Sequence, residues 1–260
     1  MGTDNFLEIG SKHKICEDYT LIGDKYIIVS DGCSTSPMTD VGARILTISA
    51  ATAIKRFLKQ SMIPDYEQFA MTTLHTARGH INAMGLPEEC LNATLLITFR
   101  IFDSYYTYVY GDGHVCIEYK SGKKVHWEYV YGKEDDPDSN APFYLNYWFE
   151  PEKYIEQFGT DNLTVKSNGE KMNFPDNKGS LIYHDSKVIT LATDGVESFL
   201  IPGQDKLDAV TAMNEFCSYK NYKGEFVQRR CKAALKKFGR TWENISHYDD
   251  IAVAAIYHDE

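Results

Sequence analysis

The sequence lacks any long apolar run. No stretch of its 260 residues approaches the roughly 18 consecutive apolar residues that a membrane-spanning helix needs. The first residues also lack the basic segment followed by an apolar segment that marks a secretory signal. We therefore expect a cytoplasmic protein that makes no contact with a membrane.

Cysteine pairs and an excess of basic charge are missing too. The six cysteines form no Cys-x-x-Cys pair, which favours reduced thiols over a disulfide framework or a zinc site. The 27 lysines and arginines are outnumbered by 37 aspartates and glutamates, so the net charge is −10. A general nucleic-acid binder needs a basic surface, and we expect no nucleic-acid partner.

The motifs of several hydrolase classes are also absent. A cysteine phosphatase needs an arginine six positions after its cysteine, but Cys33 is followed there by Thr39 and the other cysteines also lack that arginine. A haloacid-dehalogenase-type enzyme needs Asp-x-Asp, whereas Asp31 is followed by Cys33 and Asp194 by Val196. The phosphate-binding loop Gly-x-x-x-x-Gly-Lys-Ser/Thr, the dinucleotide fingerprint and His-Glu-x-x-His do not occur. Cys33 is then interpreted as a small space-filling residue.

Aspartates at the ends of apolar runs are what the chain does contain. Such runs lead into Asp31, Asp112 and Asp194, and another follows Asp249. Carboxylates at the ends of neighbouring strands converge on one rim, where like charges raise each other's pKa unless a cation neutralises them. Oxygen ligands of this kind suit hard cations, so the sequence predicts a Mg²⁺ or Mn²⁺ site.

Such a site could activate water. Two divalent ions held about 3.5–4 Å apart lower the pKa of a bridging water and stabilise an in-line displacement at phosphorus. Several carboxylates from distant chain positions are required for this. Asp31, Asp194 and Asp249 supply three, and Glu17 and Asp18 supply more.

Apolar periodicity predicts strands and helices that come in groups rather than in simple alternation. Residues 132–179 differ from the rest because they are rich in proline, asparagine, aspartate and aromatics, and we interpret them as an irregular, flap-like insertion. The grouping favours an α+β layered fold, although propensity alone does not separate two stacked sheets from one. The expected elements are strands at 19–23 and 25–30, helices at about 41–58 and 65–84, strands at 93–102, 105–110, 114–120, 124–130, 180–183 and 187–193, one or two helices within 206–238, and a final strand.

The order of six short motifs resembles that of the PP2C (PPM) family of metal-dependent protein serine/threonine phosphatases. The resemblance spans nearly the whole chain and implies one domain over residues 1–260. Its fold would be a four-layer α-β-β-α sandwich, with two mostly antiparallel sheets flanked by helix pairs. The motifs are Glu17-Asp18, Ser30-Asp31-Gly32, Asn92-Ala93-Thr94, Gly111-Asp112-Gly113, Ala192-Thr193-Asp194-Gly195 and Asp249-Asp250-Ile251-Ala252-Val253.

The resemblance also implies a centre with two Mg²⁺ or Mn²⁺ ions and a weaker third site. Asp31, Asp194 and Asp249 would carry catalysis. The implied ligands are Asp31 to both metals, the Gly32 carbonyl to one, Asp194 and Asp249 to the metal on one side, Glu17 and Asp18 through water to the other, and Asp112 to the third.

Three positions depart from the family pattern. The arginine that usually clamps substrate phosphate is replaced by His13, flanked by Lys12 and Lys14, so His13 and Lys14 are the expected substrate contacts. Cys33 follows the first aspartate motif where many members have histidine or methionine. Ser198 stands where an aspartate often supports the third metal.

The leading functional hypothesis is hydrolysis of phosphoserine and phosphothreonine on proteins through a water activated by two metals. Phosphorylated proteins would be the substrates, and a kinase-regulated protein is a possible partner. Two alternatives stay open at this point. One is a pseudophosphatase, a binding module without turnover, and the other is a metallo-phosphatase of small phosphorylated metabolites.

Overall fold

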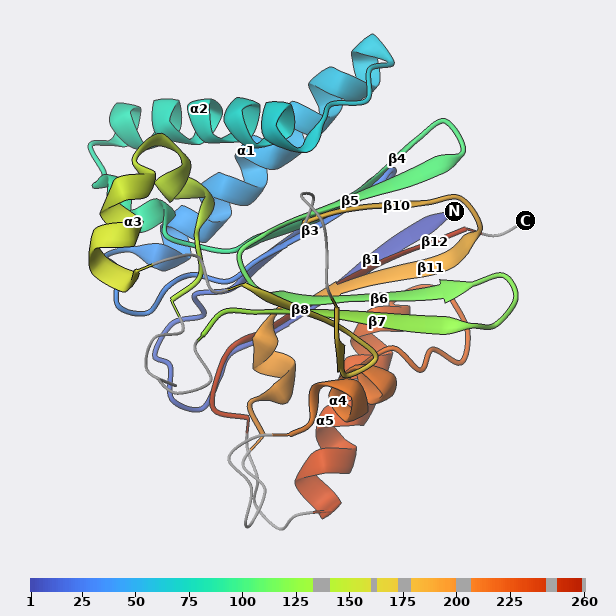
Figure 1. Ribbon diagram of the computed structural model, residues 1–260. Coiled ribbons are helices and arrows are strands. Elements are labelled where there is room, and N and C mark those ends of the chain that lie inside the picture. Colours follow the sequence, from blue (N-terminus) through green and yellow to red (C-terminus); the bar gives the residue numbers. More distant parts are fainter. Residues whose placement is uncertain (133–140, 160–162, 173–178, 200–206, 242–246, 259–260) are drawn as a thin grey trace.

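Two stacked antiparallel sheets form the centre of the molecule (Figure 1). The computed structural model describes residues 1–132, 141–159, 163–172, 179–199, 207–241 and 247–258. Every strand pairing among these residues is antiparallel. In spatial order, the seven-stranded sheet contains β1 (Gly2–Glu8), β12 (Ile251–Tyr257), β11 (Ser186–Ala192), β6 (Gly113–Tyr119), β7 (Lys124–Val130), β8 (Thr164–Ser167) and β9 (Glu170–Lys171), and the five-stranded sheet contains β10 (Ser180–Tyr183), β5 (Ser104–Tyr110), β4 (Leu95–Ile101), β3 (Tyr26–Ser30) and β2 (Tyr19–Gly23).

Helix pairs cover the outer faces of both sheets (Figure 1). The first pair, α1 (Thr39–Gln60) and α2 (Tyr66–Met84), packs on the five-stranded sheet. The second pair, α4 (Ala209–Phe216) and α5 (Phe226–Thr241), packs on the seven-stranded sheet. The predicted four-layer α-β-β-α sandwich is therefore confirmed. The remaining short elements are α3 (Pro151–Phe158) and the 3₁₀ turns η1 (Glu88–Leu91), η2 (Leu145–Phe149) and η3 (Asp194–Glu197).

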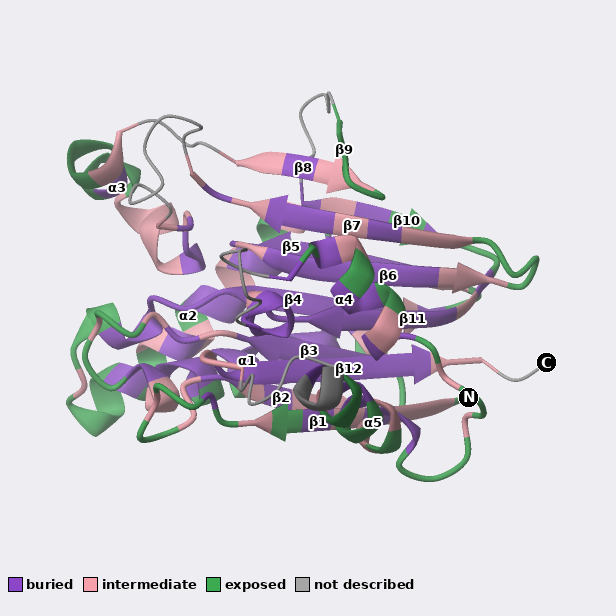
Figure 2. Cartoon of the chain, turned by 90° about the horizontal axis from the view of Figure 1, so that it is seen from below, coloured by how far each residue is buried: buried purple, intermediate pink, exposed green. Residues whose placement is uncertain are grey.

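Alternating side chains hold the layers together. In β3, Tyr26 and Ile28 pack against the helices, whereas Ile27 and Val29 point into the core between the sheets. All four are buried, as the purple strands in Figure 2 show for the sheets as a whole. Each fully buried aliphatic side chain of this kind contributes about 2 kcal/mol of transfer free energy. This double-sided burial fixes the strand register, and with it the position of the residue that follows β3.

The sequence did not predict β1. A charged residue inside a short strand is costly to bury, and Asp4 breaks the apolar pattern there. The structure removes that cost because Asp4 Oδ2 accepts hydrogen bonds from the backbone N–H groups of Val227 (2.6 Å) and Gln228 (3.3 Å) in the first turn of α5. Asp4 thus supplies an anion at a helix N-terminus, where it is favourable.

The segment 132–179, predicted to be an irregular flap, contains regular elements where it is described. It holds η2, α3, β8 and β9, and β8 extends the seven-stranded sheet by pairing with β7. The rest of the predicted flap, residues 133–140, 160–162 and 173–178, lies outside the described residues. Across the described chain, no helix is both long enough and apolar enough to cross a membrane.

Candidate metal centre

Strand ends bring the predicted aspartates to one rim of the sandwich. Asp31 directly follows β3, and Asp194 lies two residues after β11. Asp249 lies two residues before β12, and Asp112 occupies the turn between β5 and β6. The neighbouring order of β12, β11 and β6 in one sheet explains why the last three come together.

The electrostatics of Asp31 show that the carboxylates converge. Burial raises the pKa of Asp31 well above its usual value, and the charges of Asp18, Asp194, Asp249 and Asp112 raise it further, in that order. Neighbouring charges raise a pKa in this way only when they lie close to the group and are poorly screened by water. The structure therefore gathers the predicted carboxylates around Asp31.

Asp18 lies beneath Asp31 and touches it. Its side chain is buried, its carboxyl group hydrogen-bonds that of Asp31, and Thr193 Oγ1 donates to Asp18 Oδ2 over 2.7 Å. Burial raises the pKa of Asp18 well above its usual value, and these two hydrogen bonds offset only part of that rise. Two acids in hydrogen-bond contact share a proton when no cation is present. The expectation that Asp18 binds a metal through water stays a prediction, and its contact with Asp31 places it beside the proposed bridging ligand.

Asp249 stands at the more open side of the rim. Burial raises its pKa to about 6, with the charge of Asp194 as the next contribution. The backbone N–H of Asp250 (2.9 Å from Oδ1) and the nearby His13 lower the pKa only in part. Ionisation of Asp249 therefore costs free energy, and a bound cation would remove that cost.

Thr94 holds the backbone around Asp31. Its N–H donates to the Asp31 carbonyl (2.8 Å), and its Oγ1 accepts from the Asp31 N–H (3.0 Å). Gly32 pairs with Ala93 in an isolated bridge, and Ser30 Oγ donates to the Thr94 carbonyl over 2.6 Å. The predicted motif Asn92-Ala93-Thr94 thus fixes the aspartate rather than contributing a carboxylate.

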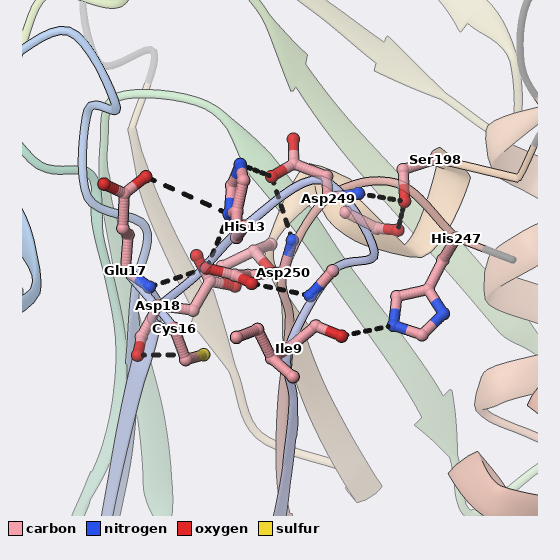
Figure 3. A network of polar contacts seen from close by, with 12 residues as sticks. Ile9, His13, Cys16, Glu17, Asp18, Ser198, His247, Asp249 and Asp250 are labelled. Carbon is pink, nitrogen blue, oxygen red and sulfur yellow. Dashed lines mark hydrogen bonds and ion pairs between the residues drawn. The ribbon is translucent and has the colours of Figure 1, made fainter.

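Asp250 is a residue of the site whose role sequence reasoning missed. Its buried carboxylate accepts from the N–H groups of Gly10 (2.7 Å) and Glu17 (2.6 Å). It also lies 2.9 Å from His13 Nδ1 (Figure 3). The available signal was the pair of adjacent aspartates, because neighbouring residues of an extended chain point to opposite sides. Asp249 faces the rim, and Asp250 fastens the loop that carries Glu17.

His13, expected to contact substrate phosphate, faces carboxylates. Burial lowers its pKa, but the hydrogen bond to Asp250 and the charges of Asp250, Asp249 and Glu17 outweigh burial and raise the pKa overall. Its Nε2 lies 3.6 Å from Asp249 Oδ1, and its Nδ1 lies 3.9 Å from Glu17 Oε2. Neither of these two distances is a hydrogen bond. Lys14, the other expected contact, is exposed.

Gly195 and Ser198 join the Asp194 and Asp249 segments. A Cβ at Gly195 would lie 1.7 Å from the Asp250 carbonyl oxygen, so only glycine permits this backbone approach. Ser198 Oγ donates to the Gly195 carbonyl (2.7 Å) and accepts from the Asp249 N–H (3.2 Å). Ser198 stands where an aspartate often supports the third metal in the family. In this protein it connects the two segments instead.

The segment before α3 closes over another side of the rim. The buried Tyr144 hydrogen-bonds Cys33, and Asn146 Nδ2 donates to Asn92 Oδ1 over 3.1 Å. Burial raises the pKa of the Cys33 thiol, but hydrogen bonds to Thr35, Tyr144 and Ser36 outweigh it and lower the pKa. Cys33 is half-buried and does more than fill space, since it ties this segment to the loop after Asp31.

Glu197, an acidic side chain three residues after Asp194, points into the protein. Its Oε1 lies 3.0 Å from His114 Nε2, and His114 Nδ1 lies 3.2 Å from His126 Nε2. All three side chains are buried. Burial lowers the pKa of His126 to about 3, helped by His114, so this imidazole is neutral. The partners lie on β6 and β7, too far along the chain for sequence reasoning to have joined them to Glu197.

The donor chemistry fits divalent cations, although the described residues do not hold a ready-made cage. Within the described parts of the chain, no three His, Cys, Asp or Glu side chains are already arranged around a common metal position. The rim nevertheless offers carboxylate oxygens, which hard cations prefer. The raised pKa values of Asp18, Asp31 and Asp249 express repulsion that such a cation would relieve.

Two stacked antiparallel sheets, outer helix pairs and an acidic rim at one end of the strands define the fold of the metal-dependent serine/threonine phosphatases. The chain belongs to the protein phosphatase 2C family, which matches it over residues 11–238. This family match spans all the rim aspartates except Asp249. No curated protein matches the chain.

Solved bacterial phosphatases share this fold. The serine/threonine phosphatase PstP/Ppp of Mycobacterium tuberculosis is 12% identical, with a TM-score of 0.55 and coverage of 100% of this chain and 99% of that one. The S. agalactiae serine/threonine phosphatase is 11% identical, with a TM-score of 0.57 and 99% coverage of both chains. A PstP catalytic domain in complex with two manganese ions is 12% identical, with a TM-score of 0.52 and coverage of 99% and 98%. At these identities the likeness establishes the fold.

Proposed function

We propose that this protein is a Mg²⁺- or Mn²⁺-dependent phosphatase that hydrolyses phosphoserine and phosphothreonine on proteins. The observation that carries the proposal is the convergence of carboxylates on Asp31, whose pKa they raise. A cluster of acids that repel one another destabilises the folded protein unless a bound cation neutralises their charge. Membership of the phosphatase family supports the reaction class.

The proposed metal centre follows the geometry of the rim. Asp31 lies among the other acids, which suits a ligand shared by two ions. When bound, the two ions would supply an activated water and offset charge on the phosphate oxygens. The proposed ligands are Asp31 and the Gly32 carbonyl at the centre, Asp194 and Asp249 on one side, Glu17 and Asp18 through water on the other, and Asp112 at a weaker third site.

The proton between Asp18 and Asp31 gives this centre a measurable property. A carboxyl oxygen that holds a proton cannot at the same time ligate a cation, so loading the centre displaces that proton. Thr193 keeps its hydrogen bond to Asp18 Oδ2 and orients the group that remains. Metal uptake is therefore expected to release protons to the buffer.

On the substrate side, we propose His13 and Lys14 as the phosphate contacts. Asp250 holds His13 Nδ1, which leaves Nε2 beyond hydrogen-bond distance of Asp249 and able to donate to a phosphate oxygen. Lys14 is exposed beside it and offers a point charge. Together they would replace the two-pronged contact that an arginine makes with phosphate.

The test is hydrolysis of p-nitrophenyl phosphate and of phosphoserine and phosphothreonine peptides with Mn²⁺ or Mg²⁺. The wild type should hydrolyse both the small ester and the peptides, and EDTA should stop it. Asp31→Asn and Asp194→Asn should abolish turnover. Asp24→Asn is the matched control, because Asp24 is an exposed aspartate in the hairpin turn at the opposite end of β2 and β3.

Two outcomes would contradict the proposal. A protein that binds Mn²⁺ without turnover on any of these substrates would be the binding module. Turnover of the small ester with none of the peptides would identify a phosphatase of small metabolites. Neither alternative is favoured, because the gathered carboxylates argue against a binding module without turnover and the matching family is one of protein phosphatases.

A further inference from the structure

A cleft of about 850 Å³ lies next to the proposed metal centre. The first turn of α2, strand β5 and the segment before α3 form its walls. Residues that line it and matter below are Asp65, Tyr66, Glu67, Gly111, Phe143 and Trp148. The volume exceeds that of any single side chain, so the cleft can admit a side chain together with neighbouring residues of a bound peptide.

Two short segments border both the cleft and the rim. Gly111 lines the cleft, and the next residue, Asp112, contributes to the charge felt by Asp31. Phe143 lines the cleft, and the next residue, Tyr144, hydrogen-bonds Cys33 beside the rim. A peptide with its phosphate at the rim therefore places a neighbouring side chain at the cleft.

The walls of the cleft are aromatic. The rings of Tyr66, Phe143 and Trp148 are half-buried and line it. Tyr66 is held in place by stacking on Tyr110, with ring centroids 4.4 Å apart, and its hydroxyl donates to the Val109 carbonyl. Fixed aromatic faces attract flat cations and apolar stems alike.

The mouth of the cleft is acidic. Asp65 and Glu67 are exposed there, and none of the described residues that line the cleft is basic. Asp65 Oδ1 accepts from the Gln68 N–H (2.7 Å), so part of its charge is used to cap α2. Glu67 forms no ion pair with any described residue, and its carboxylate is available to a ligand.

We infer that the cleft binds an arginine side chain of the phosphoprotein substrate, close in sequence to the phosphorylated residue. This inference rests on the proposed function. An arginine matches both features, because its planar guanidinium stacks on aromatic rings and pairs with carboxylates while its stem covers apolar surface. The selectivity of the enzyme would then come from Glu67 and Trp148, outside the metal centre.

The experiment compares phosphopeptides that carry arginine at each position within about four residues of the phosphoserine, roughly 13 Å of extended chain. Each is matched by peptides with citrulline, norleucine or alanine at the same position. At one or two positions, arginine should raise kcat/KM about 5- to 10-fold over citrulline, the size of one cation–aromatic contact with a nearby carboxylate. Norleucine should resemble citrulline.

Variants of Glu67 give the second measurement. Glu67→Gln should reduce the arginine-to-citrulline ratio towards one, and Glu67→Lys should invert it. The alanine peptide is the internal reference, so a general loss of activity does not mimic the effect. Glu170→Gln, an exposed glutamate on β9, is the matched control and should keep the full ratio.

The failures are distinguishable. Equal rates for arginine and citrulline at every position would overturn the cleft assignment and leave the proposed function intact. An equal benefit from norleucine, unaffected by Glu67→Lys, would show an apolar cleft and also overturn it. Hydrolysis of p-nitrophenyl phosphate without hydrolysis of any phosphopeptide would overturn both proposals.

Discussion

The protein buries acidic side chains in two neighbouring places and treats them in opposite ways. Around Asp31 the acids face one another, and their pKa values rise. Three residues after Asp194, Glu197 turns inward and meets His114 at 3.0 Å, with His126 behind it. In the first cluster the neighbours of Asp31 are acids, whereas in the second cluster Glu197 meets imidazole groups of the protein itself.

The difference teaches how to separate a binding site from a structural polar cluster. Both clusters contain a buried acid, Asp18 in the first and Glu197 in the second, so burial alone does not tell them apart. The sign of the neighbouring charges tells them apart, because partners of opposite charge stabilise a buried charge and partners of like charge destabilise it. Under the proposed function, the carboxylates around Asp31 make the metal-free protein less stable, whereas Glu197 makes it more stable.

Asp31→Asn tests this contrast with the largest expected effect. Hydrolysis should fall about 1,000-fold, equivalent to about 4 kcal/mol in the activation barrier. The metal-free variant should nevertheless be at least as stable as the wild type, because the amide removes a repelled charge and can still donate to Asp18. Chemical denaturation in EDTA measures the stability. A clearly destabilised apo variant would show that Asp31 is structural.

Glu197→Ala should behave in the opposite way. Its removal leaves the buried His114 Nε2 without the carboxylate that lies 3.0 Å away, at a cost of about 3 kcal/mol in unfolding free energy. Glu197→Gln keeps an acceptor oxygen and should lose about 1 kcal/mol. Urea denaturation midpoints at constant slope give both values. Equal losses in the two variants would mean that packing, rather than the polar contact, matters at this position.

Metal addition should stabilise only the cluster around Asp31. At about 100 times the dissociation constant, Mn²⁺ should add about 2.7 kcal/mol to the unfolding free energy of the wild type. Thermal shifts with and without EDTA report this gain. Glu197→Gln should retain the gain, and Asp31→Asn should lose it. A gain of the same size in Asp31→Asn would place the bound ion elsewhere.

The pH dependence is the smallest of these effects. The folded-state pKa of Asp249 is raised from 3.8 to about 6, and those of Asp18 and Asp31 are also raised. The folded protein thus holds more protons than the unfolded chain between these limits. Stability from Asp249 is fully present below about pH 4 and is lost as pH rises through about 6, and the raised pKa values of Asp18 and Asp31 act in the same direction.

Metal-free protein should accordingly unfold at a higher temperature at pH 5 than at pH 7, and Asp249→Asn should flatten this slope. Saturating Mn²⁺ should reverse the trend, because protons then compete with the ion. A metal-free protein that becomes steadily more stable from pH 5 to pH 7 would contradict the raised pKa values.

Sequence reasoning found the parts of the site that local pattern encodes. Asp31 and Asp194 each end an apolar run beside a glycine, so both the strand and the carboxylate at its end can be read within a few residues. Glu197 and Asp250 could not be found in this way. Their roles depend on partners that tertiary structure supplies, and the Asp250 contact with Glu17 spans 233 residues.

The fold was predictable to a similar extent. The paired helices and the strands from β2 to β7 follow from apolar periodicity and turn residues. Strand β1 could not be predicted in this way, because Asp4, which contacts α5, interrupts its apolar pattern. The His13 side chain also took an unexpected direction, since its attraction to three nearby acids was invisible in the sequence.

The hydrogen bonds from Gly10 and Glu17 to Asp250 have a consequence for how the protein folds. They close loops of 240 and 233 residues, and β1 must pair with β12 over even longer separations, since Gly2 pairs with Tyr257 and Glu8 with Ile251. Contacts between residues so far apart in the sequence form late and slowly, because the chain loses the entropy of loop closure before these contacts stabilise it. The proposed metal centre should therefore be among the last features to assemble, so that a partly folded chain has helices and sheets but does not yet bind the proposed ions.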